Sequence, residues 1–70
     1  MRKINSKLIL DLMLERGLDV HEVAKGAGVS PTVLSLLLRH PRQCRFSTIA
    51  KLAKYFGLSP YELILKEEED

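Results

Sequence analysis

Residues 19–38 read DVHEVAKGAGVSPTVLSLLL, and two helix starts lie eleven residues apart in this stretch. At the first, the Asp19 carboxylate can accept the backbone N–H three residues on while the Glu22 side chain reaches back, which is a capping box. At the second, Ser30 precedes Pro31, and proline at the first helical position loses no hydrogen bond. Glycines between the two segments favour a turn. The stretch therefore predicts two short helices that cross over a tight turn, a helix-turn-helix.

The rest of the chain predicts three further helices and little else. Strand-like alternation of apolar and polar residues is hard to find, and the apolar residues are mostly Leu, Ile, Val, Met and Ala. One helix precedes the pair and ends at Gly17, and two follow it, separated by Gly57 and by a second serine-proline start at Ser59. We therefore expect an all-α, compact five-helix domain. The expected helices cover residues 5 or 6 to 16, 19 to 26–28, 30–39, 47–56 and 59–65, within a domain of residues 1–65 that is followed by an acidic tail of residues 66–70.

The predicted helix 30–39 has two distinct faces. Residues three and four apart fall on the same side of a helix, so an apolar set can pack inward while a mixed set points outward. The expected core side consists of Val33, Leu34, Leu37 and Leu38. The expected outward side consists of Thr32, Ser35, Leu36 and Arg39.

The first predicted helix carries more apolar surface than a helix packed on one side needs. Leu10 and Leu14 are the surplus residues. They are either simply exposed leucines, which are common, or part of a second contact surface. Together with Leu36 they are the residues through which a protein partner could bind.

Charge is unevenly distributed along the 70 residues. The net charge is +2, but four acids, Glu67 to Asp70, close the chain. No Asp or Glu lies between Val23 and Tyr61, whereas six Lys or Arg do. A polyanion could lie along such a surface, and a solvated basic face explains the same charges equally well. Charge alone leaves both interpretations open.

Composition excludes several classes of protein. A chain of this length supports one domain, and one cysteine cannot close an intrachain disulfide. The first residues are too polar for a secretory signal, and no apolar run approaches the ~20 residues that span a bilayer. We therefore expect a soluble, cytoplasmic protein with no membrane association.

Catalytic and metal-binding patterns are weak. His21 and His40 have no neighbouring acid or nucleophile in an evident pattern, and His40 with Cys44 supplies only two of the three or four ligands that a zinc site needs. Cys44 is either a small loop or core residue or a thiolate favoured by Arg42 and Arg45. We expect neither an enzyme nor a bound cofactor.

Two motifs carry a resemblance to a known family. They are Leu18-Asp-x-x-Glu-Val-Ala24-x-x-x-Gly28-Val-Ser30 and Ile49-Ala-Lys-Leu-Ala53-Lys-x-Phe-Gly57-Leu-Ser59-Pro-x-Glu-Leu63. Over roughly Leu8 to Ile64 the chain resembles the phage-repressor (Cro/cI, XRE-type) helix-turn-helix family. The resemblance implies a five-helix domain whose third helix enters the major groove of double-stranded DNA. It also implies a transcriptional regulator, most often a repressor, that binds an operator as a homodimer.

The resemblance further implies roles for individual positions. Those facing bases would be Pro31, Thr32, Ser35 and Leu36, with Arg39 at the end of the same face. Those meeting phosphates would be Val20, His21, Arg42, Arg45 and Ser47. Arg2 and Lys3 would form an N-terminal arm.

Three departures from the family pattern bear on function. Val20 stands where the family often has a phosphate-holding glutamine, although the backbone N–H groups there remain usable by an anion. Met13 and Leu38 together replace a buried Arg–Glu pair, so no charge is left unpaired and we expect the two to touch. The outward face has no Gln, Asn or Arg before Arg39 to read a base bidentately. Specificity would then depend on DNA shape, on Arg39 and Arg42, or on the N-terminal arm.

Two functional hypotheses follow. The first is a DNA-binding regulator that occupies an operator, and the second is a protein-interaction module on the same scaffold, such as an antitoxin. The clustering of basic residues on the side that phosphates would occupy favours the first. Near the junction of the last two helices, Tyr55 and Tyr61 could lie beside a dimer contact, whereas Phe56 is better explained as a core residue.

Overall fold

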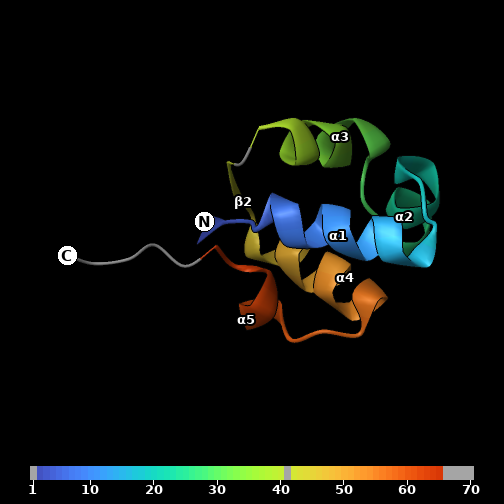
Figure 1. Cartoon of the computed structure of the whole chain (residues 1–70). Coiled ribbons are helices and arrows are strands. Elements are labelled where there is room, and N and C mark those ends of the chain that lie inside the picture. Colours follow the sequence, from blue (N-terminus) through green and yellow to red (C-terminus); the bar gives the residue numbers. More distant parts are fainter. Residues whose placement is uncertain (1, 41, 66–70) are drawn as a thin grey trace.

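The computed structural model describes residues 2–40 and 42–65 and contains the five expected helices (Figure 1). The predicted acidic tail, residues 66–70, lies outside the described residues. Within the described part of the chain, no helix is both long and apolar enough to cross a bilayer. The elements are β1 (Arg2–Lys3), α1 (Ser6–Arg16), α2 (Val20–Ala27), α3 (Pro31–Arg39), β2 (Gln43–Cys44), α4 (Phe46–Phe56) and α5 (Pro60–Leu63).

The helix ends around the predicted turn are confirmed. The Asp19 carboxylate accepts the Glu22 backbone N–H at 2.9 Å, and Glu22 accepts the Asp19 N–H at 3.3 Å. Ser30 Oγ accepts the Val33 N–H at 3.4 Å and so caps α3. Gly28 ends α2 with φ of 77°, a left-handed conformation that costs glycine little because it has no Cβ. These local bonds set the directions in which α2 and α3 leave the turn.

The last two helices differ from prediction at their ends. α4 begins at Phe46, one residue early, with Arg45 at the N-cap. α5 stops at Leu63, and the prediction that it continues to residue 65 is wrong. The reason is a competing pairing: Ile64 forms an antiparallel bridge with Ile4, and the Leu65 N–H donates to the Lys3 carbonyl at 2.9 Å.

A short two-stranded ribbon, β1 with β2, was not expected from the sequence. Arg2 lies opposite Cys44 and Lys3 opposite Gln43 in an antiparallel register. Strands of two residues are too short to show a two-residue hydropathy period. Arg2 and Lys3, which we predicted to form an N-terminal arm, are therefore part of a paired strand, and their contact with DNA stays a prediction.

The core lies between the helices and includes most of the predicted inward positions. Leu34 and Leu37 are buried, with 0% and 2% of their surface exposed, whereas Val33 is 43% exposed. The prediction that Val33 is a core residue is wrong, because it lies about 100° from Leu34 around the helix and so at the edge of the apolar arc. The fully buried large side chains are Ile4, Ile9, Val23, Leu34, Ile49, Leu52 and Leu63.

The two positions that replace the family's charge pair are both apolar contributors to the core. Met13 belongs to the buried cluster, and Leu38 is half-buried and packs against it. Neither position strands a charge, which agrees with an exchange of a buried ion pair for packed apolar groups. Direct contact between the two side chains stays a prediction.

A buried hydrogen bond joins α1 to α3. Ser6, which is buried at the first turn of α1, donates from Oγ to the backbone carbonyl of Leu37. In a continuing helix that carbonyl would accept the N–H of residue 41, but residue 41 is a proline and has no N–H. The Ser6 hydroxyl therefore satisfies a carbonyl that α3 cannot satisfy itself, and it fixes the C-terminal half of α3 on the scaffold.

Ser6→Ala is expected to lower the free energy of unfolding by about 1–3 kcal/mol, because it leaves the Leu37 carbonyl buried without a partner. Urea denaturation followed by circular dichroism measures this change. Ser47→Ala is the matched control, since Ser47 is exposed and does not cap α4, and it should change stability by no more than about 0.5 kcal/mol. Equal stability of the two variants would contradict the role of Ser6.

Candidate nucleic-acid interface

The outward face of α3 and the start of α2 together line a shallow hollow of about 330 Å³. All five predicted base-facing residues line it, and the two predicted phosphate-facing residues of α2 line it as well. The structure therefore brings together residues that the sequence assigned to two separate helices. The lining residues are Val20, His21, Pro31, Thr32, Ser35, Leu36 and Arg39.

A second hollow, of about 390 Å³, lies on the other side of α3, between this helix, β2 and the start of α4. Leu36 lines both hollows and is 39% exposed, so it stands on the ridge between them. Two predicted phosphate-facing residues, Arg42 and Arg45, line the second hollow. Ser47 is exposed in the first turn of α4 but lines neither hollow. The residues of the second hollow are Val33, Leu36, Leu37, Arg42, Gln43, Cys44, Arg45 and Thr48.

The charged groups around α3 are basic and accessible. Arg39, Arg42 and Arg45 are all exposed, and none of them forms an ion pair with a described acid. A guanidinium in this state keeps its five donors for a ligand, and its planar fork matches the oxygens of a phosphate. The surface on both sides of α3 can therefore bind a polyanion without first breaking an ion pair to any acid within the described residues.

The start of α2 offers backbone rather than side-chain chemistry. The Val20 side chain is half-buried and packs against the core, and it carries no hydrogen-bonding group, while His21 is exposed. The first N–H groups of a helix have no acceptor within the helix and can bind an anion. In α2 the Asp19 carboxylate already accepts the Glu22 N–H, so the N–H groups of Val20 and His21 are those that remain for an anion. This supports the expectation that the backbone replaces the glutamine that Val20 displaces.

The two residues of β2 differ in exposure: Cys44 is buried, whereas Gln43, which the sequence analysis did not select, is exposed. Cys44 is buried, and this burial raises the pKa of its thiol above the ordinary value of 9.0. The raised pKa contradicts the interpretation of Cys44 as an activated thiolate, because desolvation disfavours the charged form of the thiol. Gln43, next to it, is exposed and faces the second hollow. The position of Gln43 follows from the pairing of β2 with β1, and no sequence pattern near residue 43 indicates that pairing.

Comparison with known proteins gives the family. Residues 9–67 match the model of the Cro/C1-type HTH DNA-binding domain. The chain belongs to this family. It is also 35% identical over 63 residues to the cryptic phage CTXphi transcriptional repressor RstR of Vibrio cholerae. That alignment covers 90% of this chain and 57% of the relative, so the chain spans little more than half the relative's length. No solved structure gave a significant match.

Family membership confirms the resemblance drawn from the sequence motifs and the helix-turn-helix assignment of α2 and α3. The roles of single residues towards DNA stay predictions. Leu10 and Leu14 are 45% and 84% exposed, as expected for surplus apolar residues, and Phe56 is buried in the core, as predicted. A protein partner at the exposed leucines stays a prediction.

Proposed function

We propose that this chain is a transcriptional repressor domain that binds operator DNA in the cytoplasm by inserting α3 into the major groove. One observation carries the proposal: the residues predicted to face bases, from Pro31 to Arg39, line a single concave surface together with the start of α2. An α-helix fits the major groove, and its exposed side chains can reach base edges there. The repressor activity of the similar phage protein supports the direction of regulation.

Binding would divide between two sets of residues. Arg42 and Arg45, with the N–H groups at the start of α2, would contact phosphates and set the position of α3 on the duplex. Thr32 and Ser35 would each supply single hydrogen bonds to bases, and Leu36 would contact a thymine methyl group. A repressor built this way acts by occupying its site and excluding polymerase or another protein.

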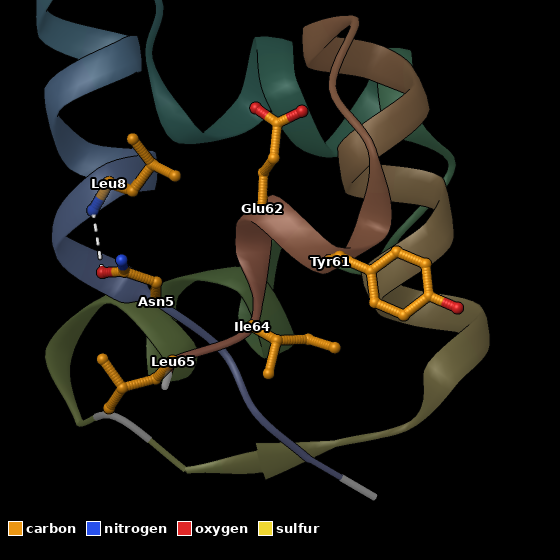
Figure 2. A pocket seen from close by; sticks show the side chains of 6 residues that line it. All are labelled: Asn5, Leu8, Tyr61, Glu62, Ile64 and Leu65. Carbon is orange, nitrogen blue, oxygen red and sulfur yellow. Dashed lines mark hydrogen bonds between the residues drawn. The ribbon is translucent and has the colours of Figure 1, made fainter. Parts of the chain in front are cut away.

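We also propose that two copies bind together through the surface around Tyr61. Tyr61 is 78% exposed and Phe46 is 64% exposed, and together with Ile64 they line a hollow of about 350 Å³ between α4 and α5. A second hollow adjoins it and shares Tyr61 and Ile64; Figure 2 shows the residues that line this second hollow, with Ile64 and Tyr61 on one side and Leu8 and Leu65 on the other. Exposed apolar residues gathered in this way are typical of protein contacts. A two-fold dimer is the arrangement that a palindromic operator requires.

Selection of duplexes from a random pool tests the DNA function. The expected product is an enriched palindrome whose half-sites are centred about 34–36 Å apart, one turn of the double helix. Failure to bind any duplex at about 50 mM salt, where phosphate contacts are strongest, would refute the proposed function. Enrichment of a single, unrepeated half-site would refute the dimer but not the DNA function.

Tyr61→Glu is expected to weaken self-association at least roughly tenfold, because at a two-fold contact the new charge would lie near its own copy. Sedimentation at several concentrations, alone and with operator DNA, measures this effect. Leu14→Glu is the matched control: Leu14 is the most exposed of the large apolar residues described but lies on α1, in neither hollow. If both variants and the native chain are monomers alone and on DNA, the proposed interface is wrong.

A further inference from the structure

We propose that Gln43, which β2 carries beside α3, reads a base edge and supplies most of the sequence discrimination that α3 itself lacks. The inference rests on the proposed DNA function and deepens it. It makes β2 a second reading element next to the helix. It also answers the problem raised by the sequence, since the face of α3 before Arg39 holds no side chain that can contact a base bidentately.

The ribbon determines which way Gln43 faces. Successive side chains of a strand point to opposite faces. Cys44 is buried, so its neighbour Gln43 points away from the core, and Gln43 is exposed. Gln43 is also one of the residues that line the hollow on the flank of α3, together with Val33 and Leu36. Gln43 is therefore presented on the side of the molecule where α3 would meet a groove.

The ribbon is held firmly enough to position a reading residue. Gln43 is paired with Lys3 in the antiparallel register, and the Ile4 N–H donates to the Arg42 carbonyl at 3.3 Å just before β2. Cys44 anchors the other end in the core. Figure 1 shows β2 lying between the end of α3 and the start of α4, with the N-terminal strand beside it. Fixed placement of this kind lowers the entropy lost when a side chain binds.

The chemistry of the side chain favours adenine. In the major groove adenine presents N7 as an acceptor and N6 as a donor, and the glutamine amide offers the complementary donor and acceptor. Among the described residues that line the two hollows, Gln43 has the one amide side chain, and this amide forms no hydrogen bond with a described residue. Thr32 and Ser35 carry hydroxyl groups that make single bonds. Gln43 therefore has the strongest means of distinguishing bases on this surface.

The residues around Gln43 favour a contact between its side chain and a base rather than a phosphate. Arg42 and Arg45 flank it in the sequence and line the same hollow, and guanidinium groups are the better ligands for phosphate. Leu36, on the ridge beside it, suits a thymine methyl group. Adenine pairs with thymine, so an A·T pair presents both features at once in the major groove. We expect Gln43 and Leu36 to prefer A·T pairs at one position or at adjacent positions of each half-site.

The test compares duplexes selected by the native chain with those selected by Gln43→Ala and Gln43→Glu. Gln43→Ala is expected to lose the adenine preference at one position of each half-site and to bind the selected operator about 5- to 150-fold more weakly. Its affinity for unrelated duplexes and its salt dependence should not change. Gln43→Glu should shift the preference at that position towards cytosine, whose N4 group donates to a carboxylate. A purely structural role for Gln43 would produce no such shift.

Arg42→Ala is the contrasting variant, since removal of a phosphate ligand weakens binding to all sequences alike and lowers the salt slope by about 1. The inference is overturned if Gln43→Ala keeps every base preference of the native chain. It is also overturned if Gln43→Ala behaves as Arg42→Ala does, because Gln43 would then contact phosphate. A native chain that binds no duplex refutes the proposed function itself, which is a different result from either of these.

Discussion

Leu34→Ala is expected to lower the free energy of unfolding by about 2–5 kcal/mol, a large part of the stability of a domain this small. Leu34 is fully buried and anchors α3 to the core. Alanine forms helices at least as well as leucine, so helix propensity does not contribute to the destabilisation. The destabilisation comes from the missing apolar packing and the cavity that remains. Urea denaturation with an unchanged m-value would measure it directly.

Leu36→Ala, two positions along the same helix, is the matched comparison. Leu36 is partly exposed on the ridge between the two hollows, so its removal is expected to cost about 1 kcal/mol or less in unfolding. It should instead weaken operator binding roughly threefold to fivefold, because the variant cannot pack against a thymine methyl group. Equal destabilisation by the two substitutions would show that the two faces of α3 are assigned wrongly.

The sequence predicted the helices well because their ends depend on local chemistry. A capping carboxylate, a serine before a proline, and a glycine in the left-handed region each act within about four residues. The bonds at Asp19, Ser30 and Gly28 therefore form as the pattern indicates. The same locality explains why the helix period could identify the outward set Thr32, Ser35, Leu36 and Arg39, whereas Val20, His21 and Pro31 were named from the family resemblance.

The features that were missed depend on pairing between distant segments. β1 and β2 are some forty positions apart, and their two residues each are too few to produce a hydropathy pattern. The end of α5 is set by the pairing of Ile64 with Ile4, which no residue near Leu63 indicates. Gln43 was overlooked for the same reason. In this chain, the helices can be predicted from residues close together in the sequence. The ribbon, and the position of Gln43 on it, can be found only from the three-dimensional structure.

Arg42→Ala and Arg45→Ala are expected to weaken binding to every duplex alike and to leave the fold unchanged. Both side chains are exposed and unpaired among the described residues, so folding does not depend on their charge. Removing one phosphate ligand should lower the slope of log K against log salt by about 1, and the double variant should lower it by about 2. A charge-assisted hydrogen bond contributes about 1.5 kcal/mol or more, so the double variant should bind roughly 100-fold more weakly at low salt.

Lys7→Ala provides the control for total charge, because it also removes one positive charge but lies on α1, outside both hollows. Its salt slope should stay within the error of the native value. If Lys7→Ala and Arg42→Ala lower the slope equally, the effect is one of net charge, and no specific phosphate contact need be made at Arg42. If only the arginine variants lower it, the phosphates lie along β2 and the start of α4. A DNA backbone in this position would bring Gln43 within reach of a base.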